Sequence, residues 1–353
     1  MPFDLAALQA LTQNSSQQTW AFIKEQCLDI AIAKSTQPLS IEEAARQVRQ
    51  REREIGKFDD FLSSIGWELW FSFEQNMPHT AERLIAWWAE SDAAKAILIL
   101  DGLSLREMPW LIEGAKTHGF TLKTCTAYAS ELPSDTNSFA KALGFASRSQ
   151  LENNGGNAKG KFSNASTESM NLPWEDCAAL VKNQPQPHWF FWHHWPDTEL
   201  HHLVKQGQGK GLDDLTQQAA KQLTSPAFWA FVTHLAQGRQ LVITSDHGYA
   251  STGTFADEKE EVGNFLKKTF AAQRYTKGAS HKASDKQSGE TQQNGLYGPF
   301  VPPVALALTT AHGTYSLALG RRKWKCQGGY PTLTHGGLSL LETLSPFIEL
   351  EKR

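Results

Sequence analysis

Three continuous apolar runs that each end in an aspartate constrain the fold of this 353-residue chain more than any other feature. They are "KAILILDG", "HWFFWHHWPD" and "RQLVITSDHG", and they lead to Asp101, Asp197 and Asp246. A short apolar run bounded by a turn signal is typical of a strand buried on both faces of a parallel sheet. Between them, "LREMPWLIEGAKTHG" and "NSFAKALGF" have helical spacing. Strands that alternate with helices predict a doubly wound, mostly parallel α/β sheet.

The sequence before these runs has a different pattern. In residues 1–92, "IEEAARQVRQREREIGKFDDFL" and "AERLIAWWAESDAA" place apolar residues at helical spacing, without a catalytic constellation. We therefore expect a helical N-terminal region over residues 1–92 and an α/β domain over residues 93–353. Within the latter, the Asn/Gly/Ser-rich residues 147–166 predict a surface loop. The polar residues 277–295 predict a flexible insertion, either a lid over the site or a plain surface loop.

Composition narrows the class of protein. Apolar residues make up 40% and charged residues 20% of the chain, as in soluble globular proteins. The net charge of −3 gives no basic footprint for non-specific binding to duplex DNA. The four cysteines form no C-x-x-C pair, which argues against a disulfide framework and a cysteine-type zinc site. No signal-peptide pattern is present, and no apolar run approaches the ~20 residues of a membrane span, so we expect a cytoplasmic protein.

Aspartate residues, one of them with a histidine beside it, follow the predicted strands. Because parallel strands end at one edge of a sheet, Asp101, Asp197, Asp246 and the adjacent His247 could converge there. Aspartate is also a common turn residue, so each one alone is weak evidence and the set is more informative. Carboxylates and neutral imidazoles together hold pairs of divalent metals, and such a pair clamps a phosphoryl group.

A candidate nucleophile lies in "ELPSDTNSFAKALG". Thr136 follows a proline-marked turn and opens a helical pattern, where its hydroxyl can lose a proton to a metal. The helix N-terminus there offers backbone N–H groups to a phosphate. The alternative is that Ser134, Asp135 or Thr136 only caps a helix.

The ordered series "LILDG", "LPSDTNSFAKAL", "PDTELHH", "TSDHG" and "THGGLSLLETLSPFIEL" resembles the alkaline phosphatase superfamily, and within it the PglZ domain. The "SDHG" and "HGGLSLLE" phrases are the most specific. The resemblance covers residues 96–350 and leaves the helical N-terminal region unexplained.

The resemblance implies two divalent metal ions, zinc with manganese as the alternative, bound by two sets of side chains. The first set is Asp101, Asp246, His247 and Thr136, and the second is Asp197, His201 and His335. In "HWFFWHHWPDTELHHL" the aromatic run is then the buried strand and the metal ligands begin at Asp197. His193 and His194 become packing or outer groups, and His202 is not a ligand.

The chain departs from the PglZ pattern in places. Ser134 stands where many PglZ sequences have threonine, so it remains a reserve nucleophile. The following helix has Ala140 and Lys141 where the family has an arginine, so the phosphate-binding cation is not assigned. In "GLSLRE", Arg106 and Glu107 either orient the site or form a surface ion pair.

The resemblance implies a phosphodiesterase that acts on nucleotides or on linear or cyclic oligonucleotides. Thr136 would attack phosphorus to give a phosphothreonyl intermediate that water then hydrolyses. A role in bacterial phage defence, of the BREX type, or in signalling follows, with other defence proteins as partners. The alternative is a non-catalytic PglZ scaffold that recruits such proteins. A phosphomutase is a third possibility, and a sulfatase is disfavoured because no Cys-x-Pro-x-Arg motif is present.

Overall fold

The computed structural model describes most of the chain. The described residues are 14–33, 41–152, 160–183, 186–206, 211–252, 259–278, 302–326, 329–330 and 332–352. Of the predicted insertion at 277–295, only residues 277 and 278 belong to them, at the end of a strand. The rest of that prediction lies outside the described residues.

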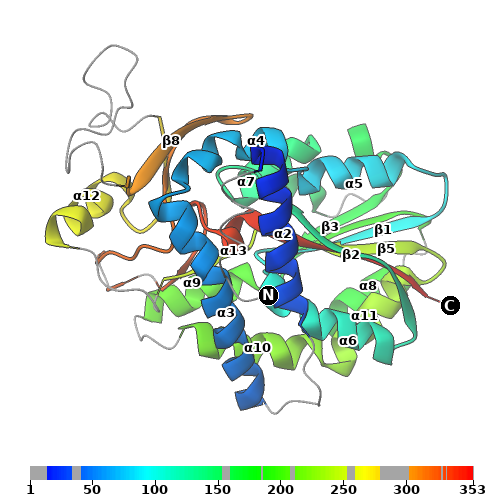
Figure 1. The fold of residues 1–353 in the computed structure, drawn as a ribbon. Coiled ribbons are helices and arrows are strands. Elements are labelled where there is room, and N and C mark those ends of the chain that lie inside the picture. Colours follow the sequence, from blue (N-terminus) through cyan, green and yellow to red (C-terminus); the bar gives the residue numbers. More distant parts are fainter. Residues whose placement is uncertain are drawn as a thin grey trace.

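A six-stranded sheet forms the centre of the molecule, in the order β2-β11-β5-β1-β4-β3 (Figure 1). Its strands are β1 Lys95–Leu100, β2 Phe120–Ala129, β3 Ser166–Met170, β4 Trp189–His193, β5 Gln240–Thr244 and β11 Leu344–Lys352. Strands β5, β1, β4 and β3 pair in parallel, and β11 is antiparallel to both β5 and β2. The three apolar runs are β1, β4 and β5, so the predicted mostly parallel sheet is confirmed.

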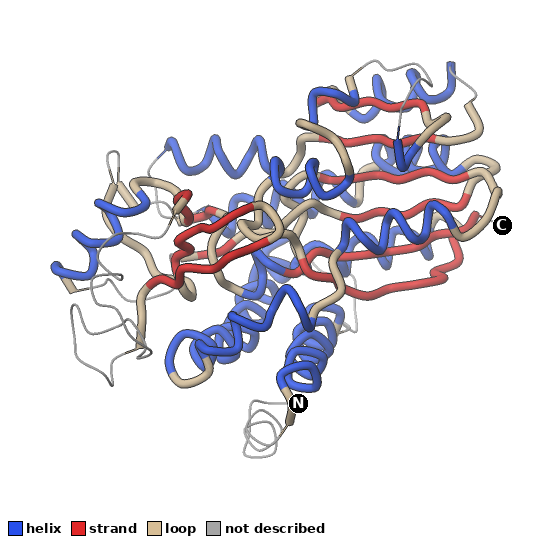
Figure 2. The backbone as a smooth tube through the Cα atoms, turned by 90° about the horizontal axis from the view of Figure 1, so that it is seen from above, coloured by secondary structure: helices blue, strands red, loops and turns tan. Residues whose placement is uncertain are grey.

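Helices cover both faces of this sheet (Figure 2). Alternate residues of β1 enter two different buried clusters, Leu98 in one and Ile97 in the other, because successive strand side chains point to opposite faces. The first cluster includes residues of α6 Met108–Thr117, α8 Trp174–Asn183 and α11 Pro226–Ala236. The second includes residues of α5 Thr80–Ala89 and α7 Thr136–Leu143. The predicted doubly wound arrangement is therefore confirmed.

The described part of residues 1–92 is largely helical, as predicted. It contains α2 Ser16–Ile32, α3 Ile41–Ser64, η1 Trp67–Ser72 and α4 Phe73–Asn76, followed by α5, which precedes β1. Helices α2 and α3 lie side by side (Figure 1). Trp20 of α2 and Phe58 of α3 belong to the same buried cluster as Leu98 of β1. A division of the chain at residue 92 stays a prediction, and the core extends across it.

Smaller elements lie beyond the carboxyl edge of the parallel strands (Figure 2). Strands β7 Tyr275–Lys277, β8 Ala305–Thr310 and β9 Gly313–Ala318 form a sheet of their own, and β6 Ala250–Ser251 pairs with β10 Leu333–Thr334. The remaining elements are α9 Asp197–Gln206, α10 Gly211–Leu223, α12 Glu260–Phe270, α13 Leu340–Thr343, η2 Leu105–Glu107, η3 Arg148–Leu151 and η4 Gly160–Phe162. Among the described helices, none combines the length and the apolar character that a membrane span requires.

The described part of residues 147–166, predicted to be a surface loop, lies mostly at the surface but is anchored by buried side chains. Leu151 and Phe162 are fully buried, and Ser166 begins strand β3. The ring of Phe162 packs against that of Phe190 on β4, with centroids 4.8 Å apart. Two apolar anchors among polar neighbours are enough to hold this segment on the sheet.

Two helical glycines give a matched test of the packing. A Cβ at Gly114 of α6 would collide with the buried indole ring of Trp229, whereas a Cβ at Gly263 of α12 would meet nothing within 4 Å. We expect Gly114→Ala to lower the free energy of unfolding by about 1–3 kcal/mol through overpacking. Gly263→Ala should raise it by about 0.5–1 kcal/mol, because alanine favours helix more than glycine does. Urea unfolding followed by circular dichroism measures both, and the opposite order would contradict the packing of α6 on α11.

Candidate metal centre

The side chains predicted from the sequence meet at the carboxyl edge of the sheet. Asp101 directly follows β1, and Asp246 follows β5. Asp197 is the first residue of α9, which comes after β4, and Thr136 is the first residue of α7, which comes after β2. His335 directly follows β10. Because β1, β4 and β5 are parallel neighbours, their following residues arrive at one edge.

One set of side chains surrounds the hydroxyl of Thr136. Candidate ligand atoms of Asp101, Asp246 and His247 all lie within 4.8 Å of one another. His247 Nε2 is 3.4 Å from Asp246 Oδ2 and 3.7 Å from Asp101 Oδ1. Thr136 Oγ1 donates to Asp246 Oδ2 at 2.9 Å and to Asp101 Oδ1 at 3.3 Å. A cation placed among these atoms would contact the threonine hydroxyl.

A second set lies beside the first. Candidate ligand atoms of Asp197, His247 and His335 also lie within 4.8 Å of one another. His335 Nε2 is 3.5 Å from Asp197 Oδ1, and His201 Nε2 is 3.2 Å from Asp197 Oδ2. His201 lies one helical turn after Asp197 on α9, and its ring centroid is 5.7 Å from that of His335. The structure thus brings together all seven predicted residues, with His247 between the two sets.

The two central histidines present the nitrogen that a metal needs. His247 Nδ1 is 2.9 Å from the carbonyl oxygen of Gly248, and His335 Nδ1 is 3.1 Å from that of Ser134. A carbonyl only accepts hydrogen bonds, so Nδ1 carries the hydrogen and Nε2 keeps its lone pair. Burial, followed by the neighbouring His247, lowers the pKa of His335 to about 4. The imidazole of His335 is therefore neutral at neutral pH, as a metal ligand must be.

The donor set fits a divalent metal ion. The buried atoms His247 Nε2 and Asp197 Oδ1 have no hydrogen-bond partner among the described residues. An unsatisfied buried polar atom costs about 1–3 kcal/mol, which a bound cation would offset. Carboxylate oxygens and imidazole nitrogens suit zinc, and manganese also accepts such a set.

The buried carboxylates of this region have shifted pKa values. Burial and the charges of Asp246 and Asp197 raise the pKa of Asp101 well above its usual range. Burial also acts to raise the pKa of Asp197, but the hydrogen bond from His201 holds it below its usual value. Three carboxyl groups at one sheet edge therefore favour positive charge between them.

The orientation of Asp101 depends on two residues that the sequence did not reveal. Arg148 pairs through Nη1 with Asp101 Oδ2, and Trp192 Nε1 donates to the same oxygen at 3.1 Å. With Oδ2 occupied in this way, Oδ1 is the oxygen that faces Thr136 and His247. Arg148 lies in η3, inside the segment predicted to be a surface loop, and no local pattern marks it.

Asp246 is oriented in a similar way by backbone donors. Its Oδ1 accepts hydrogen bonds from the N–H of Gly102 and from that of His247, each at 3.0 Å. Gly102 has φ +73°, and a Cβ there would lie 3.2 Å from Cβ of Asp197. Glycine at this position therefore allows β1 to turn tightly past α9. Asp246 Oδ2 is left to face Thr136.

The other histidines of the "HWFFWHHWPDTELHHL" stretch are engaged elsewhere. His193 Nε2 is 2.9 Å from the carbonyl oxygen of Leu172, and His194 Nε2 is 2.9 Å from Ser169 Oγ. His202 lies 4.0 Å from a carboxylate of its own helix and is exposed. These contacts agree with packing roles for His193 and His194 and with a solvent-facing His202.

The two charged residues of "GLSLRE" are buried and do not form a surface ion pair. Arg106 and Glu107 are 3% and 1% exposed. Arg106 pairs with Glu52 of α3, and Glu107 accepts a hydrogen bond from the hydroxyl of Tyr249 at 2.6 Å. Of the two alternatives, the surface ion pair is wrong.

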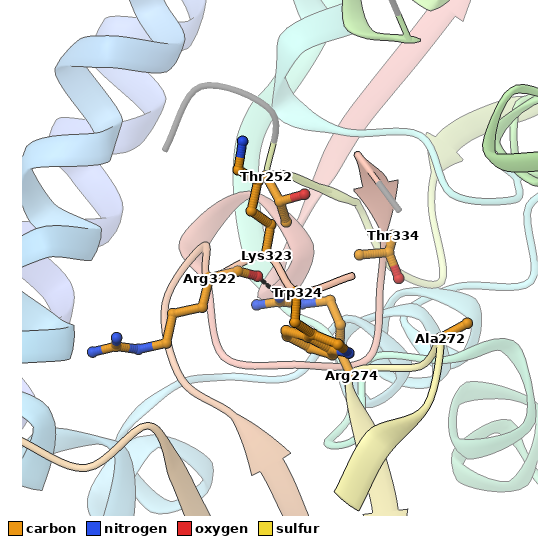
Figure 3. A pocket seen from close by; sticks show the side chains of 7 residues that line it. All are labelled: Thr252, Ala272, Arg274, Arg322, Lys323, Trp324 and Thr334. Atoms are coloured by element: carbon orange, nitrogen blue, oxygen red, sulfur yellow. Dashed lines mark hydrogen bonds between the residues drawn. The ribbon is translucent and has the colours of Figure 1, made fainter. Parts of the chain in front are cut away.

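A small basic pocket lies next to the segment that carries His335 (Figure 3). Its lining includes Thr334, the residue before His335, together with Arg274, Lys323 and Trp324. Arg274 Nη1 donates to the carbonyl oxygen of Arg322 across it at 3.2 Å. A volume of about 10 Å³ accommodates about one water molecule, so this pocket is no substrate site.

The crowding of carboxylates predicts opposite effects on the metal-free and metal-bound chain. Asp246→Asn keeps the acceptor for Gly102 and His247 but removes one charge beside Asp101. We expect it to raise the unfolding free energy of the metal-free chain by about 1 kcal/mol. It should also remove the stabilisation by zinc that comes from the Asp101, Asp246 and His247 set, which for one site in the wild type is about 2.7 kcal/mol at a hundredfold excess over Kd.

Urea unfolding with and without zinc measures both effects. The exposed Asp92 provides the control: Asp92→Asn should change either value by less than about 0.5 kcal/mol. A less stable metal-free Asp246→Asn chain that zinc stabilises like the wild type would contradict the arrangement described above.

Comparison with known proteins gives distant structural matches. No protein-family profile matches the chain, and no curated protein sequence matches it. Similar solved structures include two of murine ectonucleotide pyrophosphatase/phosphodiesterase 5, one of them an inactive form in complex with AMP. Each is 12% identical to this chain, with a TM-score of 0.41. The matches cover 73% and 74% of this chain and 88% of the murine chain.

Proposed function

We propose that the protein is a metal-dependent phosphodiesterase that uses Thr136 as its nucleophile. The observation that carries this proposal is the position of the Thr136 hydroxyl, 2.9 Å from Asp246 Oδ2 and 3.3 Å from Asp101 Oδ1. A threonine at the start of a helix and among metal-binding carboxylates is placed to attack a phosphoryl group. A helix cap has no need of these contacts, and here Asp135 is the residue that caps α7 by accepting from Ser138 N.

The residues that hold two metal ions follow from the two sets of side chains. Asp101, Asp246, His247 and Thr136 are assigned to one ion, and Asp197, His201 and His335 to the other. When bound, the ions supply positive charge that favours the deprotonated nucleophile and stabilises the charge of the phosphoryl group. Zinc suits this nitrogen and oxygen donor set, with manganese as the alternative.

Thr136 and the start of α7 carry the chemical step in this proposal. The Thr136 oxygen forms a bond to phosphorus, the bond to the leaving alcohol breaks, and the phosphothreonyl group is later hydrolysed by water. The N–H groups of the first helical turn have no intrahelical partner. The Asp135 side chain accepts from Ser138 N, and we assign the N–H groups of Thr136 and Asn137 to the binding of phosphoryl oxygens.

Arg148 is our assignment for the phosphate-binding cation that the sequence left open. It contacts Asp101, and its side chain is 28% exposed, so it reaches both the centre and solvent. A guanidinium group can bind two phosphoryl oxygens at once through its fixed fork of donors. In this proposal Arg148 binds the phosphoryl group.

The substrate class rests on the sequence resemblance to PglZ domains. We propose phosphodiesters of nucleotides or of linear or cyclic oligonucleotides, and a role in bacterial phage defence or signalling with other defence proteins as partners.

The choice of nucleophile has a direct test. Ser134 is fully buried, and its Oγ accepts from Gly336 N at 3.1 Å, away from the carboxylates. We expect Thr136→Ala to lower kcat by at least ~10³, because the covalent step is lost. Ser134→Ala should lower kcat by less than about tenfold, since the carbonyl that orients His335 is kept. Steady-state kinetics on bis-p-nitrophenyl phosphate decides, and the reverse order would assign the nucleophile to Ser134.

A substrate screen separates the proposed activity from its alternatives. The metal-loaded chain should hydrolyse bis-p-nitrophenyl phosphate faster than p-nitrophenyl phosphate, and an aryl sulfate most slowly. Uptake of well under one zinc or manganese per chain would contradict the metal centre. A chain that binds metal and acts on none of the three would favour a scaffold over an enzyme.

A further inference from the structure

Helix α3 carries two acidic side chains that are buried although the proposed reaction does not use them. Glu52 and Asp59 are 1% and 2% exposed. Arg321 bridges them, donating from Nη1 to Glu52 and from Nε to Asp59. Charged side chains are almost never fully buried unless they are paired, so these two acids hold specific partners in place.

Glu52 connects α3 to the segment of His247. Arg106 donates to both carboxylate oxygens of Glu52, from Nε at 2.7 Å and from Nη2 at 2.8 Å. The remaining nitrogen, Nη1, donates to the carbonyl oxygen of Tyr249 at 2.7 Å, and the guanidinium lies 4.3 Å from the centre of the Tyr249 ring. Tyr249 is two residues after His247. Through Arg106, Glu52 therefore fixes the backbone that follows a predicted metal ligand.

Asp59 connects α3 to the segment that follows His335. Its Oδ1 accepts a hydrogen bond from Leu340 N at 2.8 Å. This segment in turn contacts the backbone after His247, because Gly248 N donates to the carbonyl oxygen of Glu342 at 3.2 Å. The two acids of α3 thus hold the two neighbouring segments that carry the central histidines.

Such a network is better suited to positioning than to stability. A buried ionic network often stabilises a fold no more than well-packed apolar residues would. Its charge-assisted hydrogen bonds are short and directional, however, and metal ligands must be held to within about 0.5 Å. We propose that α3 positions the ligands of the metal centre. In this role Glu52 and Asp59 are positioning residues that set the affinity of the centre for metal. This inference rests on the metal centre of the proposed function.

The experiment compares substitutions at Glu52 with a matched substitution on the same helix. Glu52→Gln removes the charge, and Glu52→Asp keeps it but shortens the reach to the two arginines. Ile55 of α3 is 1% exposed and packs in the apolar core, so Ile55→Ala loosens the helix without touching the ionic network. Zinc affinity of each full-length chain is measured by competition with a chelator, and the Co²⁺-loaded chains are compared by their visible absorption spectra.

We expect Glu52→Gln to weaken zinc binding by at least ~10-fold and to alter the Co²⁺ spectrum, as changes to the groups behind metal ligands do. Glu52→Asp should act in the same direction with a smaller effect, and it decides the matter if Glu52→Gln does not fold. Ile55→Ala should lower Tm while its zinc affinity stays within about twofold of the wild type.

Two results would contradict the positioning role of α3. One is wild-type zinc affinity and an unchanged Co²⁺ spectrum in the Glu52 variants. The other is a loss of affinity in Ile55→Ala as large as that in Glu52→Gln, which would mean that any loosening of α3 has the same effect. A wild-type chain that binds no metal would instead overturn the proposed function itself.

Discussion

The crowding of buried carboxylates at one edge of the sheet is the constraint on which the rest of the structure depends. Asp101 and Asp246 are fully buried and both lie against His247 and Thr136. Like charges this close, with little water between them, repel strongly, so the surrounding groups must donate hydrogen bonds or positive charge. The donors that surround them are the N–H groups of Gly102 and His247, the hydroxyl of Thr136, the indole of Trp192 and the guanidinium of Arg148. Apart from Thr136, these donors occupy one oxygen of each carboxylate, and the other oxygen of each faces the Thr136 hydroxyl.

The strands that deliver these carboxylates could be predicted because their sequences have a local signal. Strands β1, β4 and β5 are buried on both faces, which requires the continuous apolar runs seen in the chain. Strand β3 has no such run: "STESM" is polar, and it belongs to the sheet through its parallel pairing with β4. The position of β11 between β2 and β5 depends on partners far away in the chain, so no local pattern indicates it. Loop compositions also mislead when one buried aromatic, such as Phe162, holds a polar segment in place.

The residues of the candidate site also fall into those that could be predicted from the sequence and those that could not. Asp101, Asp197 and Asp246 could be predicted because each follows a strand, whereas His201 and His335 were assigned through the resemblance to PglZ domains. The groups that orient them could not be predicted, since their partners are distant in sequence: 47 residues separate Arg148 from Asp101, and 91 residues separate Trp192 from it. Chemistry that depends on strand ends is readable from a sequence. Chemistry that depends on which helix packs over those ends is not.

The ionic network of α3 links this N-terminal helix to the segments that carry His247 and His335. Two acids, Glu52 and Asp59, face two arginines, Arg106 and Arg321, so the charges within the network balance. Leaving one buried partner uncompensated costs about 3–5 kcal/mol, so α3 cannot shift while Arg106 and Arg321 stay buried. Arg106 in turn binds the backbone next to His247, which means that a displaced α3 would also displace this ligand. Coupling of this kind is reciprocal: if docking of α3 favours metal binding, metal binding must favour docking of α3 by the same free energy. In the proposed function, helix α3 therefore helps to position the segments that carry two of the metal ligands, His247 and His335.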